Sequence, residues 1–240
     1  MRESLSRVNL LIGDRAMNKL QSSHIVVVGL GGVGSVTADA LARTGVGKLT
    51  LIDYDTVARS NINRQIFATE KTVGMLKTQA LKDGIKDINP DAKVNILSEK
   101  ITERTVDNIL KLNPDIIVDA VDDIPIKIAL IKGAQARKIK IVSSMGAALR
   151  IDPTMVRIAQ LRKTKTDPVA AKMRKSLPNN KVLVVYSEEK PYKVGTRDQF
   201  GSAMTSTGTF GLFLAHAAMY SIAGAELEWK AEEFKKQNLY

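Results

Sequence analysis

The stretch Ile25-Val-Val-Val-Gly-Leu-Gly-Gly-Val-Gly34 places a run of branched apolar residues directly before a cluster of glycines. This pattern predicts a buried parallel strand, a tight turn and the beginning of a helix. Gly29, Gly31 and Gly34 have the G-x-G-x-x-G spacing, in which the missing side chains let backbone N–H groups approach a phosphate and let the helix pack on the strand. The positive end of the helix dipole would then point at that anion.

A glycine pattern alone also occurs in loops that bind nothing, so the surrounding sequence decides. A second apolar run, residues 49–52, leads into Asp53, which follows Gly34 by 19 positions. An acidic residue at this place can accept a hydrogen bond from a ribose hydroxyl. The strand before the glycines, the helix after them and the position of Asp53 together predict a nucleotide site.

The composition is that of a globular protein and excludes several kinds of chemistry. The chain has 240 residues, 44% of them hydrophobic and 25% charged, which is enough for a full core. It has no cysteine, which excludes disulfides, thiolate metal sites and cysteine nucleophiles. Residues 1–24 carry charges and no long apolar run, unlike a secretory signal, so we expect a cytoplasmic protein.

Strand and helix patterns alternate along residues 25–144. We expect strands over 25–28, 49–53, 94–97, 116–119 and 140–144, and helices over 33–44, 72–88, 102–112 and 125–137. The alternation predicts a doubly wound, Rossmann-like α/β fold with a mostly parallel sheet. One or two short amphipathic helices are expected over residues 4–20, before the first strand.

The pattern changes near residue 145, which divides the chain into a nucleotide-binding domain with an N-terminal helical arm (1–145) and a β/α extension of the same core (146–240). Within 146–162, Asp152-Pro153 predicts a turn between two antiparallel strands. Asp167-Pro168 predicts a helix that ends near Leu177. Residues 199–225 hold no charge, but their hydroxyl side chains and glycines favour a buried or dimer-interface helix over a membrane span. A polar helix is expected over 226–240.

Positive charge is concentrated in the extension. The net charge is +11, and residues 150–198 hold twelve basic against five acidic side chains, so seven of the eleven net charges lie there. This clustering favours contact with RNA or another polyanion, although a solvated helix face would have the same composition. The expected phosphate contacts are the basic side chains of one segment, namely Arg162, Lys163, Lys165, Lys172, Arg174 and Lys175.

Polar side chains that follow the second strand distinguish an ATP-using enzyme from a dehydrogenase. Hydride transfer needs few of them, whereas adenylyl or phosphoryl transfer needs cations and donors that meet the charge of the leaving pyrophosphate. Lys77 is a second candidate cation beyond this group. The group itself consists of Asp53, Asp55, Ser60, Asn61, Asn63 and Arg64.

Acidic side chains also follow the strand expected at 116–119, in Asp119-Ala-Val-Asp-Asp123. A carboxylate at the end of a strand can hold Mg²⁺, with water filling the rest of the octahedron. Alternatively, Asp122 and Asp123 cap the next helix, which has Pro125 near its beginning.

Four motifs in this order resemble the ThiF/MoeB family of adenylating enzymes, relatives of the ubiquitin-activating enzymes. They are the glycine loop 29–34, Ser60-Asn-Ile-Asn-Arg-Gln65, Lys77 and Asp119-Ala-Val-Asp122, and the resemblance covers roughly residues 5–150. It implies a homodimer in which Arg7 reaches the site of the other subunit, and catalytic roles for Arg7, Arg64, Lys77 and Asp122, with Asp122 on Mg²⁺. The implied ATP-binding residues are Gly29, Gly31, Gly32, Gly34, Asp53, Asp55, Ser60, Asn61, Asn63, Arg64, Lys77 and Asp122.

Most members of that family adenylate a small ubiquitin-like protein and then use a cysteine or a zinc held by four cysteines, which this chain lacks. Four segments of the extension, 146–154, 166–174, 184–188 and 201–211, instead resemble the branch that dehydrates threonylcarbamoyladenosine in tRNA. That resemblance implies ATP-dependent ring closure through an acyl-adenylate, with tRNA as the partner. Ring closure is intramolecular, so a held geometry can replace a protein nucleophile.

Two other functions stay open from the sequence. One is a cysteine-free activator of a ubiquitin-like or sulfur-carrier protein, for which a sulfur-transfer protein is a possible partner. The other is a nucleotide sensor without turnover, but Arg64, Lys77 and Asp122 would be unnecessary in a sensor.

Overall fold

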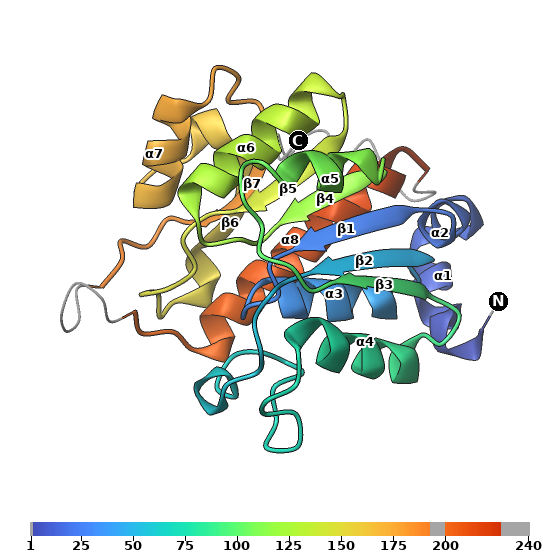
Figure 1. Cartoon of the computed structure of the whole chain (residues 1–240). Helices are drawn as coiled ribbons and strands as arrows, with labels where there is room; N and C mark the ends of the chain where they lie inside the picture. Colours follow the sequence, from blue (N-terminus) through green and yellow to red (C-terminus); the bar gives the residue numbers. More distant parts are fainter. Residues whose placement is uncertain (1, 193–199, 227–240) are drawn as a thin grey trace.

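The computed structural model describes residues 2–192 and 200–226 and shows a seven-stranded sheet with helices on both faces (Figure 1). The strand order is β3-β2-β1-β4-β5-β7-β6, and every pair is parallel except β6 with β7. The predicted Rossmann-like, mostly parallel fold with an antiparallel C-terminal element is therefore confirmed. The strands are β1 (His24–Val28), β2 (Lys48–Ile52), β3 (Lys93–Leu97), β4 (Ile116–Asp119), β5 (Lys140–Ser144), β6 (Val156–Gln160) and β7 (Leu183–Ser187).

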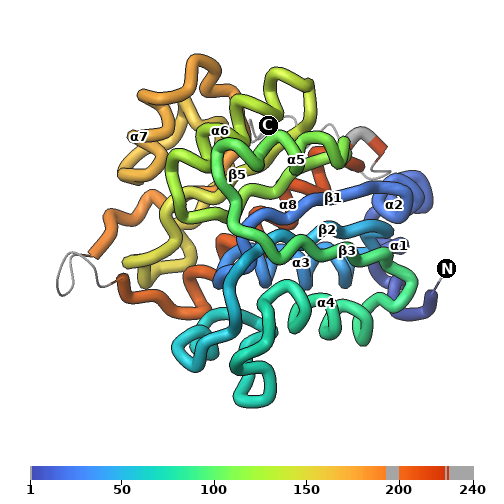
Figure 2. The backbone as a smooth tube through the Cα atoms, in the orientation of Figure 1, coloured from blue at the N-terminus to red at the C-terminus, as the bar shows by residue number. Residues whose placement is uncertain are grey.

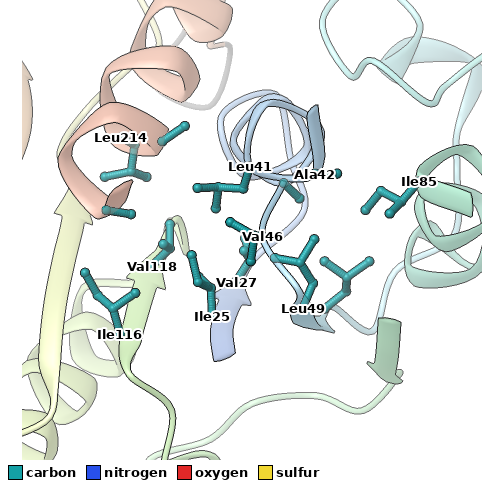
Figure 3. Close-up of a cluster of buried hydrophobic side chains, with 14 of the residues drawn as sticks. Ile25, Val27, Leu41, Ala42, Val46, Leu49, Ile85, Ile116, Val118 and Leu214 are labelled. Carbon is teal, nitrogen blue, oxygen red and sulfur yellow. The ribbon is translucent and has the colours of Figure 1, made fainter. Parts of the chain in front are cut away.

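Helices cover the sheet on both sides because alternate residues of a strand point to opposite faces. On β1, Ile25 and Val27 pack into one core and Val26 and Val28 into another. The first core includes α2, α3, α4 and α8, and the second includes α5 and α6. Figure 3 shows part of the first core, with Leu41 of α3, Ile85 of α4 and Leu214 of α8. The helices are α1 (Ser6–Ile12), α2 (Asp14–Gln21), α3 (Gly34–Arg43), α4 (Lys77–Ile88), α5 (Val106–Lys111), α6 (Ile124–Ala136), α7 (Pro168–Ser176) and α8 (Met204–Ala223).

Two predicted helices begin later than the sequence suggested. Helix α4 begins at Lys77 and not at residue 72, because Gly74 has a φ of 90° and its N–H donates to Val57 O, which holds this segment in a turn. Helix α5 begins at Val106 and not at residue 102, because Thr102 and Thr105 bond to each other in a turn.

The predicted hairpin over 146–162 is wrong. One strand forms there, β6, and its antiparallel partner is β7. Asp152-Pro153 begins a short 3-10 helix, with the Asp152 carboxylate accepting from Thr154 N at 2.8 Å. Leu149 has a φ of 60°, so the chain before Asp152 leaves the extended conformation that a strand needs.

Helix α8 is buried along much of its length, as predicted, and packs against α3, where Thr37 Oγ1 donates to Gly211 O at 3.0 Å. Within residues 2–192 and 200–226, no helix is long and apolar enough to cross a bilayer. The predicted Asp167 cap of α7 is also present, since its carboxylate accepts from Ala170 N at 3.0 Å. The polar helix predicted over 226–240 lies almost entirely outside the described residues.

The parallel strands all end at one edge of the sheet, on the left of Figure 1. The glycine loop follows β1 there, Asp53 follows β2, and the acidic loop follows β4. Residues 188–192, which follow β7, and residues 200–203, which precede α8, lie along the same edge (Figure 2). The candidate site is therefore assembled from segments that are far apart in the sequence.

Candidate active site

The glycine loop is fixed against the end of β4. Gly29 has a φ of 85°, and a Cβ atom on it would lie 2.7 Å from Ala120 O. A Cβ on Gly34 would lie 1.8 Å from Gly29 O, so the beginning of α3 can approach β1 only without a side chain. A Cβ on Gly31 would meet nothing within 4 Å. The loop is thus closed on its inner side and open at Gly31, where a phosphate has access to the helix N-terminus.

Asp53 holds this loop in place. Its carboxylate accepts from Leu30 N at 2.7 Å through Oδ2 and from Asp55 N at 2.9 Å through Oδ1. The residue is 8% exposed. Each carboxylate oxygen can accept more than one hydrogen bond, so a ribose hydroxyl can share this group with the backbone.

The segment after β2 brings Arg64 to the glycine loop. Arg64 Nη1 donates to Ser60 O and to Asn63 Oδ1, both at 2.9 Å. Its Cγ would be 3.1 Å from a Cβ on Gly32. Asn61 is buried and its Oδ1 accepts from Ala58 N at 3.1 Å, so this side chain shapes the segment from within.

Lys77 lies at the first position of α4 and pairs with Asp55. The two charged groups are 2.7 Å apart, and the Lys77 side chain is 8% exposed against 44% for Asp55. Asp55 O also accepts from Lys77 N at 3.0 Å. The ammonium group is therefore held near the crevice by a carboxylate that is itself open to solvent.

The two acidic residues after β4 have different environments. Asp123 caps α6, since its Oδ1 accepts from Ile126 N at 3.0 Å. Asp122 is exposed and makes no hydrogen bond or ion pair with the described part of the chain. Helix capping thus accounts for Asp123 and leaves the Asp122 carboxylate available to a ligand.

A buried ion pair between Asp119 and Lys127, which was not predicted from the sequence, holds the loop that follows β4. Asp119 Oδ2 accepts from Ser143 Oγ at 2.6 Å and from Lys127 Nζ at 3.0 Å, while its Oδ1 accepts from Val121 N at 3.2 Å. The side chains of Lys127 and Asp119 are 2% and 0% exposed. The available signal was a single lysine in the apolar first part of the helix expected after residue 124.

The proposed use of ATP implies a magnesium ion. The described residues of the crevice offer it one free carboxylate, that of Asp122. Residues 2–192 and 200–226 contain no group of three or more acidic, histidine or cysteine side chains that could hold a metal. Magnesium in nucleotide sites is commonly bound by one or two carboxylates, substrate phosphates and water. Asp122 can serve as that carboxylate only with the phosphates present.

The beginning of α8 lies against the segment after β2 and against the glycine loop. Asn63 Nδ2 donates to Ser202 O at 2.8 Å. A Cβ on Gly32 would lie 3.0 Å from Thr207 Oγ1. Neither residue was predicted, because Ser202 acts through its carbonyl group and Thr207 follows the glycine loop by more than 170 positions.

Arg7 does not join these residues in its own subunit. It is exposed on α1, and the adjoining Leu5 packs at Gly45, which precedes β2 at the opposite edge of the sheet. Figure 1 likewise places α1 beside the amino ends of the strands. A role for Arg7 in catalysis therefore requires a second subunit.

The basic segment 162–175 lies on and beside α7. Lys163, Lys165, Lys172 and Lys175 are exposed or partly exposed. Arg174 is partly buried and donates to Thr164 O at 3.1 Å, and Arg162 is exposed with its Nε donating to Gln160 Oε1 at 2.8 Å. Four lysines are thus presented to solvent, while both arginines contact the protein itself.

The two histidines of the chain lie away from the crevice. His24 begins β1 at the amino edge of the sheet, and burial lowers its pKa, as it lowers the pKa of His216 on α8. His216 lines an apolar hollow of about 490 Å³ between β6 and α8. No histidine is therefore placed to act as a base in the nucleotide crevice.

The fold and the crevice define a nucleotide-binding α/β protein with cations placed beside a phosphate loop. The model of the ThiF family matches residues 5–240, and the chain belongs to this family. It is 43% identical over 195 residues to the tRNA threonylcarbamoyladenosine dehydratase of Bacillus subtilis, covering 80% of this chain and 77% of that protein. With the enzyme of the same name from Escherichia coli it shares 40% identity over 180 residues, 75% of this chain and 67% of that protein.

Solved structures of the E. coli enzyme are similar to this chain over a larger share of its length. The E. coli dehydratase TcdA in complex with ATP superposes with a TM-score of 0.86 at 36% identity, covering 94% of this chain and 96% of that one. Its complex with AMP gives a TM-score of 0.87 with the same identity and coverage. The similarity therefore includes both the nucleotide-binding half and the extension.

Proposed function

We propose that this protein is an ATP-dependent tRNA threonylcarbamoyladenosine dehydratase. The observation that carries this proposal is the similarity to TcdA over 94% of the chain, which includes the extension. The chain has no cysteine, so the proposed reaction has to proceed without a cysteine nucleophile. The alternative, activation of a ubiquitin-like or sulfur-carrier protein, is not favoured, because relatives at 36–43% identity have the dehydratase name. Without cysteine, this chain has no group that could carry sulfur from a sulfur-transfer partner.

ATP would bind across the glycine loop and the segment after β2. The open backbone at Gly31 and the N-terminus of α3 would face its phosphates, and Asp53 its ribose. Arg64 and Lys77 would meet the charge that develops on the pyrophosphate as it leaves. The other proposed ligands from this part of the chain are Gly29, Gly32, Gly34, Asp55, Ser60, Asn61 and Asn63.

The reaction needs no protein nucleophile. A carboxylate oxygen of the threonylcarbamoyl group attacks the α-phosphorus of ATP, and pyrophosphate leaves. The neighbouring carbamoyl group then attacks the acyl carbon and gives up its proton to water, the ring closes, and AMP leaves with one of the original carboxylate oxygens. The crevice contributes by holding both groups of the substrate in contact, which can replace a covalent enzyme intermediate.

Asp122 would hold Mg²⁺, which when bound neutralises charge on the phosphates. Its exposed carboxylate lies at the strand edge where β1 and β4 end. Lys127 and Ser143 fix Asp119, and Asp119 fixes the loop that carries Asp122. We assign ATP binding to residues 1–145 and most of the tRNA contact to 146–240, and we expect the enzyme in the cytoplasm.

The direct test of this function compares possible substrates. Purified protein is incubated with ATP and with modified tRNA, unmodified tRNA or a small protein that ends in Gly-Gly. We expect AMP and pyrophosphate with modified tRNA only. Formation of AMP with the Gly-Gly protein and not with the modified tRNA would replace the proposed function by the alternative.

The lysines of the basic segment are expected to bind the tRNA backbone. Neutralising Lys163, Lys165 and Lys175 together should flatten the dependence of tRNA affinity on salt by about two to three units in the log–log slope, because each phosphate contact contributes about 0.7–0.9. Binding of tRNA is measured across a salt series, and ATP binding should be unchanged. The control neutralises three exposed lysines elsewhere, Lys86, Lys93 and Lys138. Equal slopes for the two triple variants would show that the segment is only a solvated surface.

We also propose a homodimer in which Arg7 completes the crevice of the partner subunit. The neighbouring Leu10 and Leu11 are 85% and 62% exposed on the same helix, as expected for residues that a second subunit covers. Arg7→Ala and Asp122→Ala homodimers should both be inactive, whereas a mixture should recover up to about a quarter of the activity, since hybrid dimers contain one intact site. Activity is measured after subunit exchange has been verified, and a mixture as inactive as its components would contradict shared sites.

A further inference from the structure

Three large side chains with exposed apolar surface lie close together at the carboxyl edge of the sheet. Ile151 is 67% exposed, Tyr192 53% and Phe200 67%. Two backbone hydrogen bonds join their segments, because Leu149 N donates to Gly201 O at 2.8 Å and Leu149 O accepts from Tyr192 N at 2.9 Å. Exposed apolar side chains that are gathered in this way commonly mark a binding surface. We call Ile151, Tyr192 and Phe200 the apolar patch.

The apolar patch is next to the nucleotide crevice. Residues 200–207 lead from Phe200 at the patch to Thr207 at Gly32. Between them, Asn63 Nδ2 donates to Ser202 O at 2.8 Å, and Ser206 Oγ donates to Ala147 O at 3.2 Å. A molecule whose reacting group enters the crevice would therefore pass over the patch.

The charge around the patch favours a polyanion. Lys190 is exposed two residues before Tyr192, and Lys165 is exposed beside Thr166, which donates to Ser187 O at 3.2 Å. The nearby Glu189 is buried and accepts from Ile151 N at 3.1 Å and from Asp152 N at 3.1 Å, so backbone donors compensate its charge. Glu188 pairs with Arg157 at 3.2 Å. Asp152, beside Ile151, is partly exposed and accepts hydrogen bonds from Thr154 N and Oγ1. Lys165 and Lys190 are thus exposed cations near the patch, whereas the carboxylates there are paired or hydrogen-bonded to the protein.

We propose, on the basis of the function proposed above, that Tyr192 and Phe200 stack on unpaired RNA bases next to the adenosine that enters the crevice. Proteins that recognise single-stranded loops of RNA splay the bases apart and stack them on aromatic rings. Two exposed rings beside a crevice, with lysines to meet the backbone, supply both kinds of contact. The patch then selects an RNA loop over the isolated modified nucleoside.

The test compares an RNA stem–loop that carries threonylcarbamoyladenosine with the free modified nucleoside. Phe200→Ala and Tyr192→Ala should each lower kcat/KM for the stem–loop by about 5- to 100-fold and leave kcat/KM for the nucleoside and the KM for ATP unchanged. Phe200→Trp, which keeps an aromatic ring, should retain the wild-type value. Leu212→Ala is the matched control, since Leu212 is 56% exposed on α8 outside the patch.

A second measurement does not depend on turnover. A stem–loop is prepared with the fluorescent base 2-aminopurine beside the target adenosine. Its fluorescence should be quenched when it binds to the wild type or to Phe200→Trp. The quenching should be weaker when it binds to Phe200→Ala. If wild-type protein forms no AMP with the modified stem–loop, the dehydratase function fails, while the quenching still decides the stacking. Equal kcat/KM and equal quenching in Phe200→Ala and wild type would overturn the stacking proposal. Loss of a dimer in Phe200→Ala, by sedimentation, without loss of quenching would assign the patch to a second copy of the chain and would also overturn it.

Discussion

Asp122→Asn should lower kcat for AMP formation by at least about 100-fold while leaving the fold intact. The metal contributes several kcal/mol of transition-state stabilisation in such reactions, and each 1.36 kcal/mol is a tenfold change in rate. The side chain is exposed and makes no hydrogen bond or ion pair with the described residues, so its replacement breaks no such interaction there. Turnover is measured at saturating ATP and magnesium, together with the melting temperature.

The adjacent residue provides the control. Asp123→Ala removes the cap of α6, which should lower the free energy of unfolding by about 1 kcal/mol and leave kcat within about threefold of the wild type. Replacing Asp122 should thus lower the activity without a large effect on stability. Replacing Asp123 should lower the stability without a large effect on activity. Full activity in Asp122→Asn, or loss of activity only in the Asp123 variant, would contradict the assignment of the metal to Asp122.

Lys127→Met should lower the free energy of unfolding by about 3–5 kcal/mol, because it leaves the Asp119 carboxylate buried without its cation. Equilibrium urea unfolding gives this quantity if the transition stays two-state. The double variant Lys127→Met/Asp119→Asn should recover much of the loss, because it removes the buried charge as well.

The matched control for this prediction is Lys132→Met on the same helix, since Lys132 is exposed. Its free energy of unfolding should stay within about 0.5 kcal/mol of the wild type. If Lys127→Met were as stable as Lys132→Met, the buried pair would not contribute to the stability of the loop that carries Asp122.

Much of the fold could be predicted because short stretches of sequence determine the individual strands and helices. The apolar runs at 25–28 and 116–119 and the helix at 33–44 have the periods of buried strands and an amphipathic helix, and the structure confirms them within one or two residues. Asp167-Pro168 likewise contains both the cap and the first turn of α7. These features depend on neighbours in the chain, so no tertiary information is needed.

Two of the wrong predictions depend on contacts between distant segments. Strand β6 pairs with β7, which follows it by more than 20 residues, and local sequence favoured a nearer partner within 146–162. Gly74 is held by Val57, which shortens α4 at its N-terminus. In each case a long-range hydrogen bond overrides the local pattern.

For the candidate site, sequence motifs indicated residues that the structure gathers at the carboxyl edge of the sheet, among them Asp53 and Asn61, which hold the backbone there. The motifs missed other residues that support the site. The glycine spacing, Arg64 and Lys77 were visible because their chemistry requires particular side chains at particular intervals. Lys127 and Ser143 act by holding Asp119, and Ser202 acts through a carbonyl group, so no motif marks them. The trans role of Arg7 stays a prediction.

The central claim is that the RNA carboxylate is activated as an acyl-adenylate, and the fate of a carboxylate oxygen tests it directly. A stem–loop whose threonylcarbamoyl carboxylate is labelled with oxygen-18 is converted with ATP, and the nucleotide products are analysed by mass spectrometry. We expect one labelled oxygen in AMP and none in pyrophosphate. Label in inorganic phosphate with ADP as the nucleotide product, or label released as water with unlabelled AMP, would contradict the claim.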